Sequence, residues 1–172
     1  MGLDAKLLSI FGDDMFSEFV KAETKEAGVD LQHSLFQKDS RQGLYLGLMN
    51  NDGSMELGLS DIDAMENFPL DYIKEKKHVF ARAQLVVLDC NIGQAAMEAA
   101  MEVCTGKIYI DAVSARKAVR AKPFLGRFDT LKLNRFEAAA LSGMKTDTES
   151  DLKRVADCFL ATGVRRVILM LG

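Results

Sequence analysis

The stretch LVVLDCNIGQAAMEAAMEVCTGKIYID, residues 85–111, decides the fold. It contains an apolar strand that ends in an acid (85–89), an Ala/Met-rich segment with helical composition (93–104) and a second strand that ends in an acid (107–111). Strands joined through a helix run parallel, and parallel strands are covered by helices and read as apolar runs. The stretch therefore predicts an α/β protein with buried parallel strands, including residues 85–89.

The same alternation continues in both directions along the chain. Downstream, we expect strands and helices in turn at TLKL (130–133), FEAAALSG (136–143), ESDLKRVADCFLATG (149–163) and VRRVILMLG (164–172). Upstream, we expect a strand, a helix and a strand at KLLSIF (6–11), MFSEFVKAETKEAG (15–28) and VDLQHSLF (29–36), with Asp13 or Asp14 as the helix cap. A charged helical stretch is expected at 71–80.

A hairpin interrupts this pattern. The runs GLYLGLM (43–49) and SMELGLS (54–60) flank NNDG (50–53), and Asp-Gly between two extended runs is a strong hairpin signal. Both faces of the two runs are apolar, whereas an outer hairpin normally has one polar face. We therefore expect this hairpin to cover a ligand, a partner chain, or both.

Composition excludes several classes of protein. The 172 residues suit one domain, and the net charge of −3 gives no reason to expect nucleic-acid binding. No apolar run reaches 18 residues, so no membrane span is expected, and the first ten residues lack the features of a signal peptide. The three cysteines and two histidines are scattered, which favours reduced thiols in a cytoplasmic protein over a zinc site or a nucleophilic hydrolase.

Polar residues follow three of the predicted strands. They are Asp89 with Asn91, then Asp111, then Asn134 with Glu137. Ligands of open α/β sheets bind beyond the carboxyl ends of the strands, where these residues are expected to meet. Each polar residue alone could instead be a helix cap.

Two residue sets at this edge each have two interpretations. Asn134 and Glu137 have the Asn-x-x-Glu spacing of a capping box, and they equally suit water-mediated Mg²⁺ binding. Lys117 could neutralise a phosphate or a neighbouring acid, or it could be a solvated surface lysine. The sequence has no glycine-rich phosphate loop, so any phosphate would be held by helix N-termini, side chains and metal.

The segment TLKLNRFEAAALSG (130–143) resembles the Lys-Pro-Asn-x-x-Glu-Ala…Leu-Ser-Gly segment of the ribokinase-like (PfkB) carbohydrate kinases. Further matches follow the same order: LLSIFGDDMFSEFV, AGVDL, VVLDCNI, YIDAVSARKA and the strand that ends at Gly172. DCNI, DAVSARKA and LSDIDAMEN are most similar to the pseudouridine kinase branch. The resemblance spans nearly all 172 residues and implies an incomplete three-layer α/β/α parallel sheet, with residues 42–62 as a small β-hairpin lid.

The resemblance also implies an activity. It is the transfer of the ATP γ-phosphate to a sugar hydroxyl, the 5′-hydroxyl of pseudouridine in that branch. Asn134, Glu137 and Lys132 would then belong to the nucleotide and Mg²⁺ site, with Glu137 reaching the metal through water. Asp111, Lys117 and Tyr45 would lie on the substrate side. The lid would also pair two subunits into a homodimer.

The chain departs from the family pattern at several points. Leu133 replaces the usual proline, and Gln42 stands where a small hydroxyl residue is usual. The early Gly-Gly…Asn sugar-binding segment is expected before Met1, and the Gly-Ala-Gly-Asp motif with the general base is expected after Gly172. We therefore expect a marginally stable or associating fragment without kinase turnover. Two alternatives remain: a non-catalytic relative that binds a nucleoside or a partner, and a kinase for ribose, fructose or adenosine.

Overall fold

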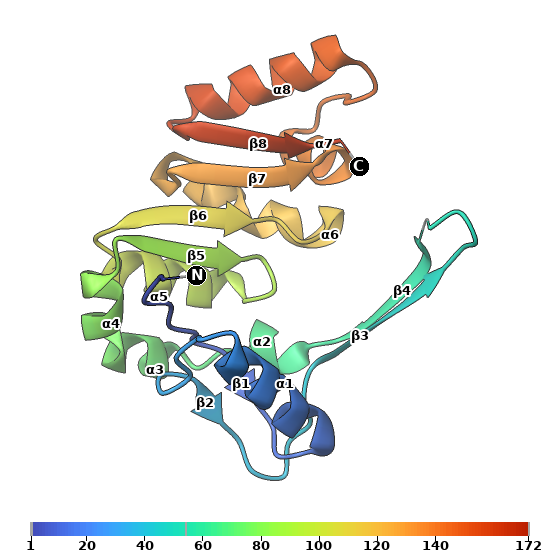
Figure 1. Ribbon diagram of the computed structural model, residues 1–172. Coiled ribbons are helices and arrows are strands. Elements are labelled where there is room, and N and C mark those ends of the chain that lie inside the picture. Colours follow the sequence, from blue (N-terminus) through green and yellow to red (C-terminus); the bar gives the residue numbers. More distant parts are fainter. Residues whose placement is uncertain (1, 54, 172) are drawn as a thin grey trace. The chain divides into compact units, whose positions relative to one another are not determined.

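The computed structural model describes residues 2–53 and 55–171. The chain forms two compact units, Met1–Phe68 and Pro69–Gly172, which are described separately below (Figure 1). Within the described residues, no helix combines the length and the apolar character needed to cross a bilayer.

The second unit is built on a four-stranded parallel sheet. Its strands are β5 (Leu85–Asp89), β6 (Lys107–Asp111), β7 (Thr130–Asn134) and β8 (Arg166–Met170). They are hydrogen-bonded in the order β5-β6-β7-β8, and every neighbouring pair is parallel. The predicted α/β fold with a parallel sheet is therefore confirmed.

Helices connect the strands of this sheet, and two further helices precede β5. They are α3 (Leu70–Glu75), α4 (Lys77–Arg82), α5 (Gln94–Val103), α6 (Ala115–Ala118), the 3₁₀ helix η1 (Val119–Arg127), α7 (Arg135–Ser142) and α8 (Glu149–Ala161). Figure 1 shows α5, α6 and α7 behind the sheet and α8 beyond β8. Helix α5 turns its small and flexible side chains inward, because Ala96, Met97, Ala100 and Met101 are all buried.

The two faces of this sheet differ in burial. Ile108, Ile110, Leu131 and Leu133 are all buried, and they alternate along β6 and β7 with more exposed residues. We expected 85–89 to be buried throughout, but Leu85 and Val87 are 53% and 64% exposed. Successive side chains of a strand point to opposite faces, and α5, α6 and α7 lie behind the sheet (Figure 1), so Leu88 is covered while Leu85 and Val87 project from the other face.

The first unit contains shorter strands than the sequence indicated. Strands β1 (Ile10–Phe11) and β2 (Leu35–Phe36) pair in parallel over two residues each, and a single bridge joins Lys6 to Asp30. Ile10, Phe11 and Leu31, from the two apolar runs 6–11 and 29–36, are buried in the core of this unit. Phe11 is buried, and its ring stacks on that of Phe36 at a centroid distance of 5.6 Å.

Helix α1 (Met15–Glu26) begins at the predicted aspartate cap. The Asp14 carboxylate accepts a 2.8 Å hydrogen bond from the Ser17 amide, which satisfies a donor of the first helical turn. The preceding residue, Asp13, accepts hydrogen bonds from the Asp39 and Ser40 amides. Gly12 lies so close to this segment that an added Cβ would stand 2.3 Å from the Ser40 carbonyl oxygen. The turn therefore anchors residues 39–40, which lead into the hairpin.

The predicted hairpin is present. Strands β3 (Leu44–Met49) and β4 (Met55–Asp61) pair antiparallel, with Leu46 opposite Leu59 and Leu48 opposite Leu57. Ser54, the first residue of the expected second strand, lies outside the described residues. Leucines on both strands are exposed, and the short helix α2 (Asp63–Glu66) follows.

The three cysteines are free and differ in exposure: Cys90 is buried, Cys104 intermediate and Cys158 exposed. Burial, and secondarily the neighbouring Asp89 carboxylate, raises the pKa of the Cys90 thiol to about 12. Because the thiolate is the nucleophile, Cys90 is expected to resist alkylation at pH 7–8 in the folded chain.

Quantitative alkylation followed by peptide mass spectrometry checks this prediction. Cys158 should label first, and Cys90 should label only after denaturation in urea. Labelling of Cys90 in the folded chain at the same rate as Cys158 would contradict the structure.

Candidate active site

The register of the parallel sheet places three charged residues in one row. Asp89 is the Cα partner of Asp111, and Asp111 is the partner of Lys132. Neighbouring strands lie about 4.8 Å apart, and paired residues project to the same face. The row therefore crosses β5, β6 and β7 close to their carboxyl ends, where ligands of α/β sheets bind.

A cleft of about 610 Å³ opens over this row. Its size lies in the range of ligand-binding sites. The residues that line it come from all four strands, the loop after β6 and the first turn of α7: Val87, Asp89, Asp111, Val113, Lys132, Asn134, Glu137 and Met170. The predicted nucleotide residues Lys132, Asn134 and Glu137 therefore share one cleft with Asp111.

The ammonium of Lys132 is bonded to Asp111 across the two central strands. Its Nζ donates a 2.6 Å hydrogen bond to Asp111 Oδ2, and each side chain is about one-third exposed. This hydrogen bond is the main reason why the pKa of Lys132 is raised above its ordinary value, and burial opposes it. The cleft therefore holds a charged lysine that is already oriented by a carboxylate.

Both aspartates of the row also bind the backbone that follows them. Asp89 Oδ1 accepts from the Asn91 amide at 2.8 Å, and Asp111 Oδ1 accepts from the Val113 amide at 3.1 Å. Val113 has a φ of 66°, which is rare for a β-branched residue. Such a conformation costs on the order of 1–3 kcal/mol, and strain of this kind is concentrated at functional sites.

The capping box predicted for Asn134 and Glu137 is confirmed, and Mg²⁺ binding by these residues stays a prediction. Asn134 Oδ1 accepts from the Glu137 amide, and the Glu137 carboxylate accepts from the Asn134 amide at 2.8 Å, which completes a capping box at the start of α7. Glu137 Oε1 also accepts from Asn134 Nδ2. The Glu137 side chain is buried beneath the cleft that it helps to line, so the cap fixes its orientation there.

The charges of the cleft favour a cation. Its lining contains three carboxylates, from Asp89, Asp111 and Glu137, and one ammonium, from Lys132, which gives a formal charge of −3 + 1 = −2. Within residues 2–53 and 55–171, no three His, Cys, Asp or Glu side chains are close enough to hold a bare metal ion. The donor set fits a hydrated Mg²⁺, which keeps most of its waters and uses one or two carboxylates.

The other two predicted site residues lie elsewhere. Lys117 is only 9% exposed, so it is not a surface lysine; its Nζ donates to Asn91 Oδ1 at 2.8 Å, and it is not among the residues that line the cleft. Tyr45 lies on β3 of the first unit and is 61% exposed.

Sequence reasoning expected Asp89 at this edge but assigned it no role, and it missed Arg120. The register with Asp111 brings Asp89 into the cleft. Arg120, whose side chain binds the loop after β5, was not noticed because its partners are backbone carbonyls. The i, i+3 spacing of Lys117 and Arg120 was the available signal.

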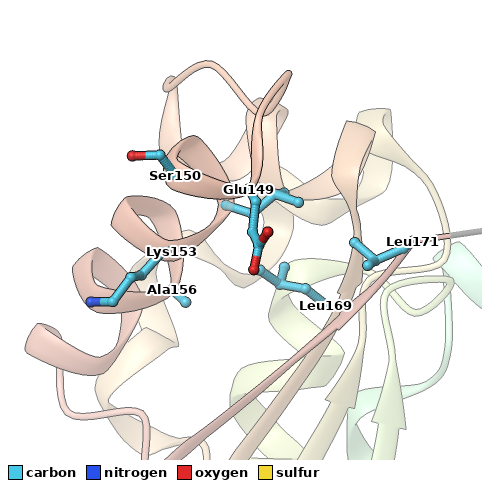
Figure 2. A pocket seen from close by; sticks show the side chains of 7 residues that line it. Glu149, Ser150, Lys153, Ala156, Leu169 and Leu171 are labelled. Atoms are coloured by element: carbon cyan, nitrogen blue, oxygen red, sulfur yellow. The ribbon is translucent and has the colours of Figure 1, made fainter.

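A second groove, of about 560 Å³, lies between α8 and β8. Figure 2 shows it, with Leu169 and Leu171 on one side and Lys153 and Ala156 on the other. None of the residues predicted to carry chemistry lines this groove, so the cleft at the strand ends is the candidate active site.

Known proteins resemble the whole chain. The family model for pfkB family carbohydrate kinases matches residues 1–172. A pseudouridine kinase from Escherichia coli K12 is 30% identical over 173 residues, covering 100% of this chain and 55% of the relative. A ribokinase from Staphylococcus aureus is 25% identical over 174 residues, covering 100% of this chain and 57% of the relative.

Solved structures agree on the fold. A carbohydrate kinase from Agrobacterium tumefaciens superposes with a TM-score of 0.78 at 22% identity, covering 99% of this chain and 55% of that one. The chain thus spans about half the length of the relatives that it matches. Because the family model matches from the first residue to the last, the chain belongs to the pfkB family of carbohydrate kinases.

Proposed function

We propose that this protein transfers the γ-phosphate of ATP to a hydroxyl of a sugar or nucleoside, most specifically the 5′-hydroxyl of pseudouridine. The observation that carries the proposal is the shared cleft of Asp111, Lys132, Asn134 and Glu137 at the strand ends. The 30% identity to a pseudouridine kinase supports the choice of substrate.

The residues of the cleft suit the requirements of phosphoryl transfer. The reaction depends on alignment and on neutralising the charge of the transferred group. A triphosphate would be repelled by the three carboxylates of the cleft, so a bound Mg²⁺ would supply the positive charge between them. Glu137, held by its cap, would bind a water of the hydrated Mg²⁺, while Asn134 and Lys132 would orient phosphate oxygens. Asp111, Lys117 and Tyr45 are proposed to serve the substrate side.

Ligand binding by the 172-residue chain tests the nucleotide part of this proposal. Titration calorimetry should show Mg²⁺-dependent binding of ATP, and Glu137→Gln should weaken the Mg²⁺ dependence by roughly tenfold, since residues that orient metal sites contribute 10–100-fold. Glutamine can still form the capping box, so the fold should survive. Asp147→Asn, which changes an exposed carboxylate, is the matched control. Equal ATP affinity with and without Mg²⁺ would contradict the proposed site.

A coupled assay on a full-length family member that carries this sequence tests the acceptor. Pseudouridine, uridine, ribose and adenosine should be compared at equal concentration, and pseudouridine is expected to react fastest. Preference for ribose or adenosine would move the protein to another branch of the family. Nucleoside binding without phosphorylation of any acceptor would support the non-catalytic alternative.

The Lys132–Asp111 pair gives a pH prediction. The pKa of Lys132 is raised in the folded chain, so the stabilisation by the pair is fully present below the ordinary lysine pKa, near 10.4, and is lost as the pH rises through the higher folded value. Asp111→Asn should return the Lys132 pKa towards its ordinary value. NMR titration of the Lys132 side chain measures this, with Asp147→Asn as control. An unchanged Lys132 pKa in Asp111→Asn would contradict the ion pair.

We also propose that the hairpin β3–β4 acts as the lid and pairs two subunits. Leu46, Leu48, Leu57 and Leu59 are exposed on it, which is more apolar surface than an isolated hairpin usually presents. The double substitution of the facing pair Leu46→Ser and Leu59→Ser should convert an associating chain into a monomer in analytical ultracentrifugation. Leu3→Ser, at an exposed leucine near the start of the chain, is the control. A wild-type chain that stays monomeric at all concentrations would overturn this assignment.

A further inference from the structure

One arginine binds three successive carbonyl groups of the loop after β5. Arg120 Nη1 donates to the carbonyl oxygens of Cys90, Asn91 and Ile92 at 3.1, 3.2 and 3.4 Å. Three carbonyl dipoles that converge on one point repel one another unless a positive charge lies between them. Arg120 therefore occupies the position that a bound cation would take in a loop of this shape.

A second cation holds the side chain of the same loop. Lys117 Nζ donates to Asn91 Oδ1 at 2.8 Å, and Lys117 is 9% exposed. Burying an ammonium is costly unless its hydrogen bonds are satisfied, so the hydrogen bond to Asn91 offsets part of the cost of burying Lys117. Lys117 is the third residue of α6, and Arg120 lies in η1. Both cations therefore reach the loop from the segment that follows β6.

The loop is connected directly to the acids of the cleft. The Asn91 amide donates to Asp89 Oδ1 at 2.8 Å, and the Cys90 amide donates to the Asp111 carbonyl oxygen at 2.9 Å. A displacement of residues 90–92 would therefore release the Asp89 carboxylate from the orientation in which it lines the cleft.

We propose that Lys117 and Arg120 are positioning residues: two built-in cations that hold the loop Cys90–Ile92 and, through the Asn91 amide, the Asp89 carboxylate at the cleft. The effect on ligand binding rests on the proposed function, whereas the effect on the loop does not. Lys117 would in this way serve the substrate side through Asn91.

Amide hydrogen exchange of the ¹⁵N-labelled full chain, followed by NMR, tests the loop. In Arg120→Ala, exchange of the Asn91 amide should accelerate by roughly tenfold or more. The loop would then open without having to break the hydrogen bonds between its carbonyl groups and the guanidinium. Arg116→Ala is the matched control, since Arg116 is an exposed arginine of α6, four residues before Arg120. The buried amides of Ile110 and Leu131 report on global opening.

Two further measurements separate positioning from general stability. Millimolar guanidinium, well below denaturing concentrations, should slow Asn91 exchange again in Arg120→Ala but should have no effect in Arg116→Ala. Lys117→Met, which keeps the length of the side chain without its charge, should accelerate Asn91 exchange independently of Arg120. Unchanged Asn91 exchange in both variants, or an acceleration equal to that of Ile110 and Leu131, would overturn the proposal.

The ligand measurement uses ATP with Mg²⁺ and pseudouridine as probes. Affinity for the probe that binds the wild-type chain should fall in Arg120→Ala and recover partly with guanidinium. A loop that opens without any loss of affinity would overturn the link between the loop and the cleft. Absence of binding to the wild-type chain would contradict the proposed function and leave the exchange result on the loop standing.

Discussion

The register of strands β5, β6 and β7 is the constraint on which the candidate site depends. Asp89, Asp111 and Lys132 meet because they are paired residues of neighbouring strands. A slip of one residue would turn them to the opposite face, where Ile110 and Leu131 are now fully buried. Burying unpaired charges costs several kcal/mol each. The apolar face therefore selects the register, and the register assembles the charged row.

The sequence predicted the second unit well because its signals are local and repeated. Apolar runs, helical composition and capping residues agree on the strands and on α5, α7 and α8, whereas α6 and η1 were not predicted. It was less informative at 6–11 and 29–36, where strands β1 and β2 pair over only two residues each. Apolar runs show that a segment is buried, but the number of paired residues depends on the neighbouring strand. The exposure of Val87 was missed because the face that the helices cover is a property of the whole sheet.

The candidate site was predictable in part. The Asn-x-x-Glu spacing fits both a cap and a metal site; the cap is formed, and Asn134 and Glu137 also line the cleft. The contacts of Arg120 were not predictable, because they join a side chain to carbonyl oxygens 28–30 residues earlier in the chain. The i, i+3 spacing of Lys117 and Arg120 indicates a shared face of the segment, but it does not show which groups that face binds. Lys117 was recognised, but its partner Asn91 became evident only when β5 and β6 were placed side by side.

The left-handed conformation of Val113 has an implication for protein engineering. A valine with a φ of 66° holds conformational energy at the mouth of the cleft, supported by the bond from its amide to Asp111. Asparagine and glycine adopt this backbone geometry more readily. Replacing Val113 by one of these residues would relieve the backbone strain and raise the thermal stability of the protein. The same replacement would risk relaxing the loop that presents Asp111.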